Sequence, residues 1–213
     1  MWTHVIGICY VIKSEQPCYP KNKKYIFVNE PVNSYIEHIE KKADYLKKLV
    51  DDLYLLFWSE AIESEVDMKS VNITEVVTSL LKEYIQNSKR ASEQLDIRLP
   101  HGNIWILAQE KILIRILCNL IDNALKYSTG DIMFYMWGES EYCHIQISNP
   151  SDYISDEELK SIFDLFYTKD EARIKSSGIG LYATRKLVIQ ISGDIQVNYE
   201  AGIFTVSIKL PLI

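Results

Sequence analysis

A repeating spacing of apolar residues between positions 32 and 57 constrains the fold of this chain more than any other feature. Apolar or small residues recur there at alternating intervals of four and three, and charged residues take many of the other positions. The repeat consists of Val32, Ile36, Ile39, Ala43, Leu46, Val50, Leu53 and Phe57. Such a heptad spacing is typical of a helix that packs along its whole length against other helices. The spacing by itself is equally compatible with one amphipathic helix lying on its own domain.

The segment before this repeat offers a partner helix. Apolar residues between Thr3 and Ser14 also recur at helical spacing. Residues 16–24 contain Pro17 and Pro20, a composition that favours a turn. We therefore expect a helical hairpin over residues 1–64, and two such hairpins form a four-helix bundle. The sequence thus predicts a homodimer joined through the hairpin.

Residues 68–213 are expected to form a second domain, after a polar interval that resembles a linker. Asn72 and Glu75 have the spacing of a capping box, which predicts the start of a helix. Further elements are expected as helices at 110–127, 156–163 and 180–191, and as extended runs at 104–108, 131–137, 142–148, 194–199 and 204–210. Because the strands come in hairpin-like pairs, we favour an α+β fold, a two-layer α/β sandwich with a mixed sheet, over a doubly wound fold.

Composition and charge exclude several functions. The net charge of −6 and the scattered Lys and Arg residues give no basic patch, so no nucleic-acid partner is expected. The cysteines are Cys9, Cys18, Cys118 and Cys143. They lie far apart and are expected to be reduced thiols of a cytoplasmic protein. The apolar run from Val5 to Ile12 is far shorter than the roughly 20 residues of a membrane span. No membrane contact is expected of this chain, although a full-length parent would be anchored in the plasma membrane.

The helix expected at 110–127 carries a polar face. Asn119, Asn123, Lys126 and Tyr127 recur at helical spacing, so they lie on one side of that helix. A carboxamide oxygen is a hard ligand that suits Mg²⁺, and an ammonium group balances phosphate charge. The pattern is therefore compatible with a metal-bound phosphate, but an exposed polar face explains the same spacing.

The order of motifs along the chain resembles one family. Residues 115–128 look like the N box of the histidine-kinase ATPases, 162–167 are similar to the F box, and 178–181 resemble the second glycine box. Residues 202–211 are similar to the last strand of that family, and 35–53 look like the second helix of its dimerisation and phosphotransfer domain. The resemblance implies half of a dimeric four-helix bundle followed by a sandwich of the histidine-kinase, gyrase and Hsp90 ATPase type.

The same resemblance implies ATP and Mg²⁺ as cofactors and assigns roles by position. Asn123 matches the Mg²⁺ ligand, Tyr127 matches an aromatic that packs on adenine, and the loop 168–177 matches a mobile lid with Lys175 as a further basic residue. The residues implied to bind nucleotide are Asn119, Asn123, Lys126, Tyr127, Asn149, Phe166, Lys169, Arg173, Ser177, Gly178, Gly180, Leu181 and Thr205.

Two departures from the family pattern stand out. Asn149 takes the place of the aspartate that reads adenine, and Ser151 and Tyr153 replace the glycines of the first glycine box. A carboxamide oxygen still accepts a hydrogen bond from an amino group, but without the assistance of charge. The second departure is the phosphoacceptor histidine, which by this alignment lies before residue 1. His4 follows the expected box and lacks its neighbouring acid, so it is not expected to be phosphorylated.

Several functions follow from these features. The first is the kinase core of a sensor histidine kinase, which transfers the γ-phosphoryl group of ATP to a histidine upstream of this chain and then to a response regulator. The alternative is a degenerate ATP-binding module that dimerises and docks a partner without phosphorylating itself. A serine kinase of an anti-sigma pathway or a gyrase-type ATPase is less compatible, because neither is expected to carry the heptad hairpin.

Overall fold

The computed structural model describes residues 35–40, 42, 43, 46, 50, 53, 57, 68–168 and 177–213. All described positions between 35 and 57 are helical, in agreement with the helix expected from the heptad spacing. The partner helix expected at 3–14, the turn at 16–24 and the boundary expected after residue 64 lie outside the described residues and stay predictions.

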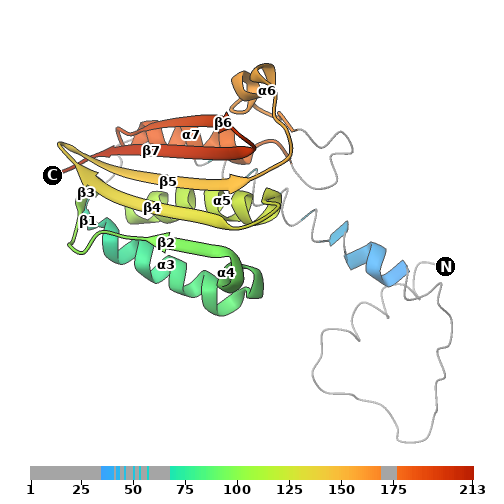
Figure 1. The fold of residues 1–213 in the computed structure, drawn as a ribbon, viewed down its shortest axis with the longest axis horizontal. Helices are drawn as coiled ribbons and strands as arrows, with labels where there is room; N and C mark the ends of the chain where they lie inside the picture. Colours follow the sequence, from blue (N-terminus) through green and yellow to red (C-terminus); the bar gives the residue numbers. More distant parts are fainter. Residues whose placement is uncertain are drawn as a thin grey trace, which may run out of the picture. The chain divides into compact units, whose positions relative to one another are not determined.

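The second domain consists of a five-stranded mixed sheet, a small two-stranded sheet and several helices (Figure 1). Its elements are β1 (Lys69–Asn72), α3 (Ile73–Asn87), α4 (Lys89–Gln94), β2 (Leu95–Arg98), β3 (Trp105–Ala108), α5 (Glu110–Tyr127), β4 (Ile132–Glu139), β5 (Tyr142–Pro150), α6 (Asp156–Ser161), α7 (Gly180–Gln190), β6 (Asp194–Glu200) and β7 (Ile203–Pro211). The large sheet has the order β2-β4-β5-β7-β6, in which only β2 and β4 run parallel. The small sheet pairs β1 with β3 antiparallel.

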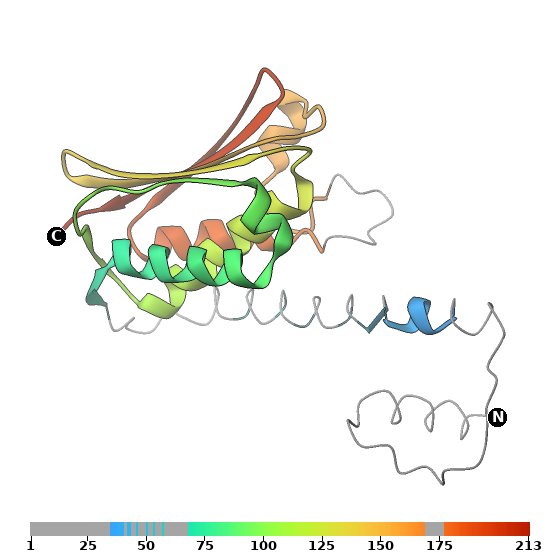
Figure 2. The ribbon, with the colours of Figure 1, turned by 60° about the horizontal axis from the view of Figure 1, so that its bottom comes forward.

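The domain has two layers, with α3, α5 and α7 on one face of the large sheet (Figure 2). Alternation along the strands explains this arrangement, because successive side chains of a strand point to opposite faces. In β4, Ile132, Phe134 and Met136 are buried, whereas Tyr135 between them is exposed. The predicted α+β fold, a two-layer sandwich with a mixed sheet, is therefore confirmed.

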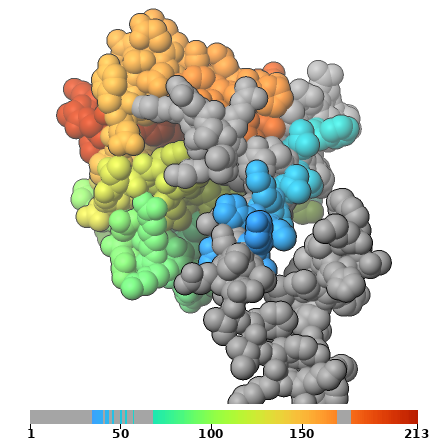
Figure 3. All heavy atoms as spheres, turned by 90° about the vertical axis from the view of Figure 1, so that its right-hand side faces the viewer, coloured from blue at the N-terminus to red at the C-terminus, as the bar shows by residue number. Residues whose placement is uncertain are grey.

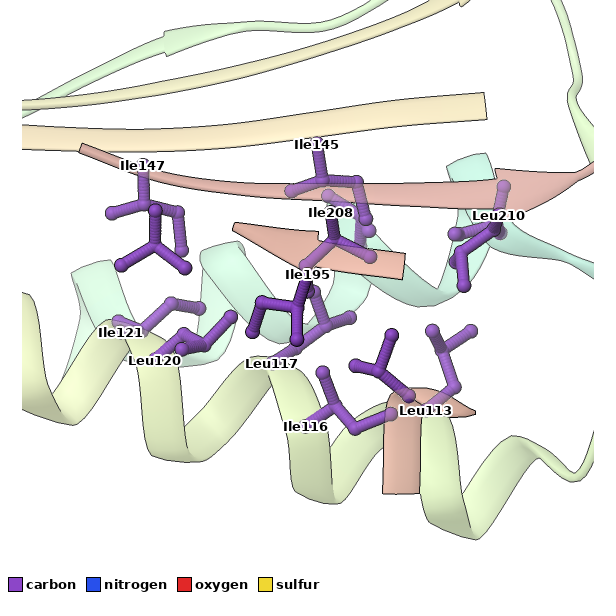
Figure 4. Close-up of a cluster of buried hydrophobic side chains, with 14 of the residues drawn as sticks. Leu113, Ile116, Leu117, Leu120, Ile121, Ile145, Ile147, Ile195, Ile208 and Leu210 are labelled. Atoms are coloured by element: carbon purple, nitrogen blue, oxygen red, sulfur yellow. The ribbon is translucent and has the colours of Figure 1, made fainter. Parts of the chain in front are cut away.

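Part of the core lies between α5 and the strands β5, β6 and β7 (Figure 4). Leu117 and Leu120 of α5 point toward the sheet, where Ile145, Ile195 and Ile208 cover them. Burying a side chain of this size contributes about 1.5–3 kcal/mol relative to an exposed one. The apolar stripe of α5 therefore fixes which face of the helix turns away from the sheet, and this determines where its polar residues lie.

Helix α3 holds α5 from another side. The Asn72 side chain caps α3 by accepting from the Glu75 N–H at 3.4 Å, which is one of the two bonds of the predicted capping box. Further along, the Tyr84 hydroxyl donates to Asp122 Oδ1 of α5 at 2.7 Å. Burial, together with the Asp122 carboxylate, raises the pKa of Tyr84, so the phenol stays protonated and keeps donating this bond. The position of α5 is thus set by both apolar and polar contacts.

The structure adds short elements that the sequence pattern did not predict and moves one turn. β1, α4 and β2 were not expected, and each has only four to six residues, too few for hydrophobic periodicity to be read. The gap between the extended runs 131–137 and 142–148 predicts a turn at 138–140. Strand β4 instead continues through Glu139, and the turn consists of Ser140 and Glu141, with Ser140 at a φ of 56° in the left-handed region.

Candidate functional site

A pocket lies between α5, the N-terminal end of α7 and the strands β5 and β7. The residues that line it are Asn119, Leu120, Asn123, Ala124, Tyr127, Ile147, Asn149, Ser151, Asp152, Ile154, Ile162, Tyr167, Thr168, Ser177, Gly178, Gly180, Leu181, Phe204 and Val206. Figure 3 views the end of the domain at which α6, in light orange, lies. The residues that line the pocket come from segments up to 87 positions apart in sequence, from Asn119 to Val206.

The polar face of α5 forms one wall of the pocket. Asn119, Asn123 and Tyr127, which are four residues apart, all line it, as expected for one face of a helix. Lys126 does not line it, because its ammonium group is turned toward Tyr127. Lys126 Nζ donates to the Tyr127 hydroxyl at 2.8 Å and lies 4.6 Å from the centre of the Tyr127 ring. Carboxamides and one aromatic ring are thus what α5 presents to a ligand.

The carboxamide of Asn119 connects α5 to α7. Asn119 Nδ2 donates to Thr184 Oγ1 at 2.7 Å, and Thr184 is fully buried. Asn119 Oδ1 lies beside Gly180, where an added Cβ would come within 2.7 Å of it. Only a glycine at position 180 lets the two helices approach this closely without displacing the carboxamide.

Gly178 closes the base of the loop that precedes α7. Its φ is +70°, and a Cβ there would lie 2.4 Å from the backbone carbon of Phe166. The Phe166 N–H donates to the Gly178 carbonyl at 3.0 Å, so the backbone segments on the two sides of the loop 168–177 are joined. Phe166 itself has a φ of 67°, and its side chain is exposed and does not line the pocket. The predicted residue Phe166 therefore supports the loop through its backbone.

Helix α7 begins at the pocket without a side-chain cap. Its first residue is Gly180, and the nearby Ser177 hydroxyl accepts a hydrogen bond from the Ile179 N–H at 3.3 Å. The N–H groups of a first helical turn have no partner within the helix, and the helix dipole makes this end favourable for anions. Together with the glycines at 178 and 180, this end of α7 has the properties of a phosphate-binding segment.

Strands β5 and β7 form the opposite wall, which is largely apolar. Asn149 is the polar exception: it is only 3 % exposed, and its Nδ2 donates to the Pro150 carbonyl at 3.2 Å. Phe204 and Val206 of β7 line the pocket, so Thr205 between them points to the other face of the sheet. Thr205 Oγ1 lies 3.0 Å from Ser148 Oγ instead. The predicted Thr205 is therefore not brought to the pocket wall.

The loop after β5 departs from the family pattern without closing the pocket. Ser151 and Asp152 line it, whereas Tyr153 is 72 % exposed and packs edge-on against Tyr199 at 6.0 Å between ring centres. Neither Ser151 nor Tyr153 has a positive φ. The two positions therefore hold side chains in ordinary backbone conformations, and a glycine is not required at either.

Other lining residues were not among those predicted to bind nucleotide. Ile154, Ile162 and Phe204 add apolar surface. Ile162 lies in the F-box segment and Phe204 in the last-strand segment, whereas Ile154 lies in neither. Tyr167 also lines the pocket, and burial, with a smaller effect of the Glu158 carboxylate, raises the pKa of its phenol. Its hydroxyl thus stays protonated and can donate a hydrogen bond to a ligand.

The basic residues predicted in the loop 168–177 and the histidines complete the set of candidate residues. Lys169, Arg173 and the further basic residue Lys175 lie outside the described residues. The described histidines are His38, His101 and His144, and none of these three lines the pocket. In the part of the chain that the structure describes, no group of three His, Cys, Asp or Glu side chains is arranged to hold a metal ion.

The fold agrees with comparisons to known proteins. Residues 108–213 match the family described as histidine kinase-, DNA gyrase B- and HSP90-like ATPases. Sensor protein DltS of Streptococcus agalactiae is 26 % identical over 186 residues, which cover 85 % of this chain and 47 % of DltS. Sensor histidine kinase RppB of Synechocystis is 24 % identical over 189 residues, covering 85 % of this chain and 41 % of RppB.

Solved structures show the same fold. Histidine kinase AdeS of Acinetobacter baumannii superposes with a TM-score of 0.65 at 19 % identity, covering 99 % of this chain and 94 % of that one. Full-length ShkA in complex with AMPPNP gives a TM-score of 0.66 at 22 % identity, covering 90 % of this chain and 40 % of that one. Residues 108–213 therefore form a domain of the ATPase family named above. More particularly, the chain contains a sensor histidine kinase catalytic domain.

The chain spans about half the length of the curated relatives that it matches. Among the described residues, no helix combines the length and the apolar composition of a membrane-spanning segment.

Proposed function

We propose that this domain binds ATP together with Mg²⁺ in the pocket between α5 and α7 and donates the γ-phosphoryl group to a histidine of a dimerisation bundle. From that histidine the phosphoryl group passes to an aspartate of a response regulator. One observation carries the proposal: the carboxamide face of α5 and the uncapped start of α7 line the same pocket. Carboxamides and free N–H groups are the ligands that a metal-bound polyphosphate requires.

The phosphate end is the part that the contacts support most directly. Gly178 and Gly180 lie at the two positions where a Cβ would collide with Phe166 or Asn119. Because α7 has no side-chain cap and Gly180 and Leu181 line the pocket, the first N–H groups of α7 would donate to the β- and γ-phosphates. Positioning and charge stabilisation are the protein's main share of phosphoryl transfer. In the reaction, the bond from the γ-phosphorus to the oxygen that bridges the β- and γ-phosphates breaks, ADP leaves with that oxygen, and a bond from phosphorus to the histidine nitrogen forms.

The pocket fits Mg²⁺ as a companion of the nucleotide. Asn123 lines the pocket one helical turn from Asn119, and its Oδ1 is the ligand that α5 would supply. Because the described residues offer no cluster of three acidic, His or Cys ligands, the phosphates and water would complete the coordination sphere, as is common for Mg²⁺. When bound, Mg²⁺ neutralises the charge that develops on the phosphates.

The opposite end of the pocket would hold the adenine ring of ATP. Ile147, Phe204 and Val206 provide an apolar surface beside the buried Asn149. Because Asn149 Nδ2 is engaged by the Pro150 carbonyl, its Oδ1 is the atom left to accept a hydrogen bond from the amino group of adenine. Tyr127, which is 43 % exposed at the mouth of the pocket, would pack on the ring.

Dimerisation through the heptad helix is part of the proposal. Five of its described apolar residues are exposed in the single chain, namely Ile39 by 49 %, Leu46 by 60 %, Val50 by 65 %, Leu53 by 53 % and Phe57 by 74 %, whereas Ile36 is half-buried. A regular row of exposed apolar side chains on a helix favours packing against another helix. A second copy of the chain is the partner expected from the heptad spacing.

Calorimetric titration with ATP and Mg²⁺ tests the binding site. We expect saturable binding to the wild-type chain and a loss of about tenfold or more in affinity for Asn123→Ala, because the metal loses its protein ligand. Asn198→Ala, at an exposed position of β6, is the matched control and should bind like the wild type. No binding to the wild type, or equal binding to both variants, would contradict the proposal.

Phosphoryl transfer is tested separately. The chain is mixed with radiolabelled ATP and a second subunit that carries the phosphoacceptor helix of a sensor histidine kinase but an inactivated ATPase domain. Transfer in trans should label the histidine of that subunit with an acid-labile phosphate. The second subunit incubated with radiolabelled ATP but without the chain should remain unlabelled, because its ATPase domain is inactivated.

A second candidate function is a regulatory module that binds a partner without phosphorylating itself. The observation that favours it is the neutral Asn149 where the family pattern has a carboxylate. ATP binding that responds to Asn123→Ala, together with no labelled histidine in the mixed sample, would favour this function over the kinase.

A further inference from the structure

A buried hydroxyl on α7 lies beside the proposed phosphate site and is not used by the proposed reaction. Thr184 has no exposed surface, yet it is a polar residue on a helix face that packs against α5. Its Oγ1 accepts a hydrogen bond from Asn119 Nδ2 at 2.7 Å. A buried hydroxyl in such a position costs free energy unless it is paired, so this bond is a specific feature of the interface.

The carboxamide of Asn119 packs against the first turn of α7. Gly180 and Thr184 are four residues apart and so lie on the same face of the helix. Asn119 Nδ2 donates to Thr184 Oγ1, and Asn119 Oδ1 is the carboxamide atom that an added Cβ at Gly180 would meet most closely, at 2.7 Å against 3.3 Å for Nδ2. With its amide nitrogen held, the carboxamide cannot rotate freely, and its oxygen is kept beside Gly180 at the start of α7; both residues line the pocket.

We propose that Thr184 is a positioning residue for the triphosphate: it fixes the Asn119 carboxamide so that the oxygen of Asn119 and the first N–H groups of α7 face the phosphates together. The inference rests on the proposed function, because it assigns a role within the same site. A hydroxyl is needed at 184 because an aliphatic side chain of the same shape leaves Asn119 Nδ2 without its partner. The carboxamide would then turn toward solvent or toward the phosphate space.

The experiment compares Thr184→Val, which keeps the shape and removes the hydroxyl, with Thr184→Ser, which keeps the hydroxyl. Each variant of the 213-residue chain is titrated with ATP plus Mg²⁺ and, separately, with adenosine, which has no phosphates. Thr184→Val should weaken ATP binding by about tenfold and adenosine binding by less than about twofold. Thr184→Ser should bind both ligands like the wild type. Placed on an Asn119→Ala background, Thr184→Val should cause no further loss, because the two side chains act as one unit.

The outcomes separate this inference from the proposed function. A wild-type chain that does not bind ATP contradicts both. A wild type that binds ATP and a Thr184→Val variant with the same affinity overturns only the role of Thr184. Equal losses for ATP and adenosine also overturn it, because they indicate a general structural defect.

Gly180→Ala provides a second test that does not depend on how Thr184→Val folds. A methyl group at 180 would meet Asn119 Oδ1 at 2.7 Å and displace the same carboxamide. We expect the same selective loss of ATP over adenosine, and unchanged ATP affinity would contradict the proposal.

Discussion

The two ends of the pocket differ in how strictly the backbone dictates the sequence. At the α7 end, Gly178 has a φ of +70° and packs against the backbone of Phe166, and Gly180 packs against Asn119. At the β5 end, Ser151 and Tyr153 replace family glycines without adopting a positive φ. Replacement of a family glycine is therefore expected to disturb the pocket only where the backbone conformation or the contacts exclude a side chain. The altered residues after β5 therefore leave the phosphate end intact, and the change with a chemical consequence is the neutral Asn149.

Gly178→Ala should produce the largest effect. The new methyl group would lie 2.4 Å from the backbone of Phe166 on a residue with positive φ, so the base of the loop must move. We expect a loss of about 3 kcal/mol in the free energy of unfolding and of at least about 100-fold in ATP affinity. Denaturant unfolding and calorimetry measure the two quantities.

Gly202→Ala is the matched control for this prediction. Gly202 also has a positive φ, of +81°, but an added Cβ meets nothing within 4 Å. Only the backbone cost of about 1 kcal/mol is expected, with unchanged ATP affinity. Equal effects of the two variants would show that crowding by Phe166 is not the reason why a glycine is required at position 178.

Asn149→Asp should have a smaller effect of the opposite sign. A carboxylate accepts the adenine amino group with the assistance of charge, so we expect ATP affinity to rise by about tenfold. Binding of inorganic tripolyphosphate, which has no base, should not change. An equal gain for tripolyphosphate would show that residue 149 does not face the base.

This variant also has a signed pH dependence. Asn149 is almost fully buried, so burial should raise the pKa of an aspartate at this position above its ordinary value. The gain in affinity needs the ionised form: it is present above that raised pKa and is lost as the pH falls through it. Without nucleotide, the variant should lose stability relative to the wild type as the pH rises, because the unfolded state ionises first. Titrations at pH 5 and pH 8 measure the difference.

Ser151→Gly should have the smallest effect. The residue has an ordinary backbone conformation, so restoring the family glycine relieves no strain. A change of less than about twofold in ATP affinity is expected, together with a slight loss of stability from the added chain entropy. A large gain in affinity would mean that the loop after β5 is restricted by its side chains after all.

The sequence predicted the long elements of the fold well and the short ones poorly. Helix α5 begins and ends where its periodicity indicated, because an apolar stripe over Glu110–Tyr127 leaves little choice of boundary. The short strand β2 joins the sheet through parallel pairing with β4, which is a long-range contact. Four residues carry too little pattern to predict such a pairing.

For the site, residues on regular elements were predicted better than their side-chain partners. The positions of Asn119, Asn123 and Gly180 follow from helix periodicity and motif order, and all three line the pocket. Thr205 was expected to contact the nucleotide, but strand alternation turns its side chain to the face of the sheet opposite the pocket. Thr184 was not recognised, since its role depends on a contact with a residue 65 positions away in sequence.

A crystal structure of the chain with AMPPNP and Mg²⁺ would show directly whether the nucleotide binds between α5 and α7. Asn123 Oδ1 should coordinate the metal at about 2.1 Å, and the first N–H groups of α7 should donate to the β- and γ-phosphates at about 2.9 Å. A nucleotide bound elsewhere, or phosphates that leave the carboxamide face of α5 in contact with bulk water, would contradict the proposed nucleotide site.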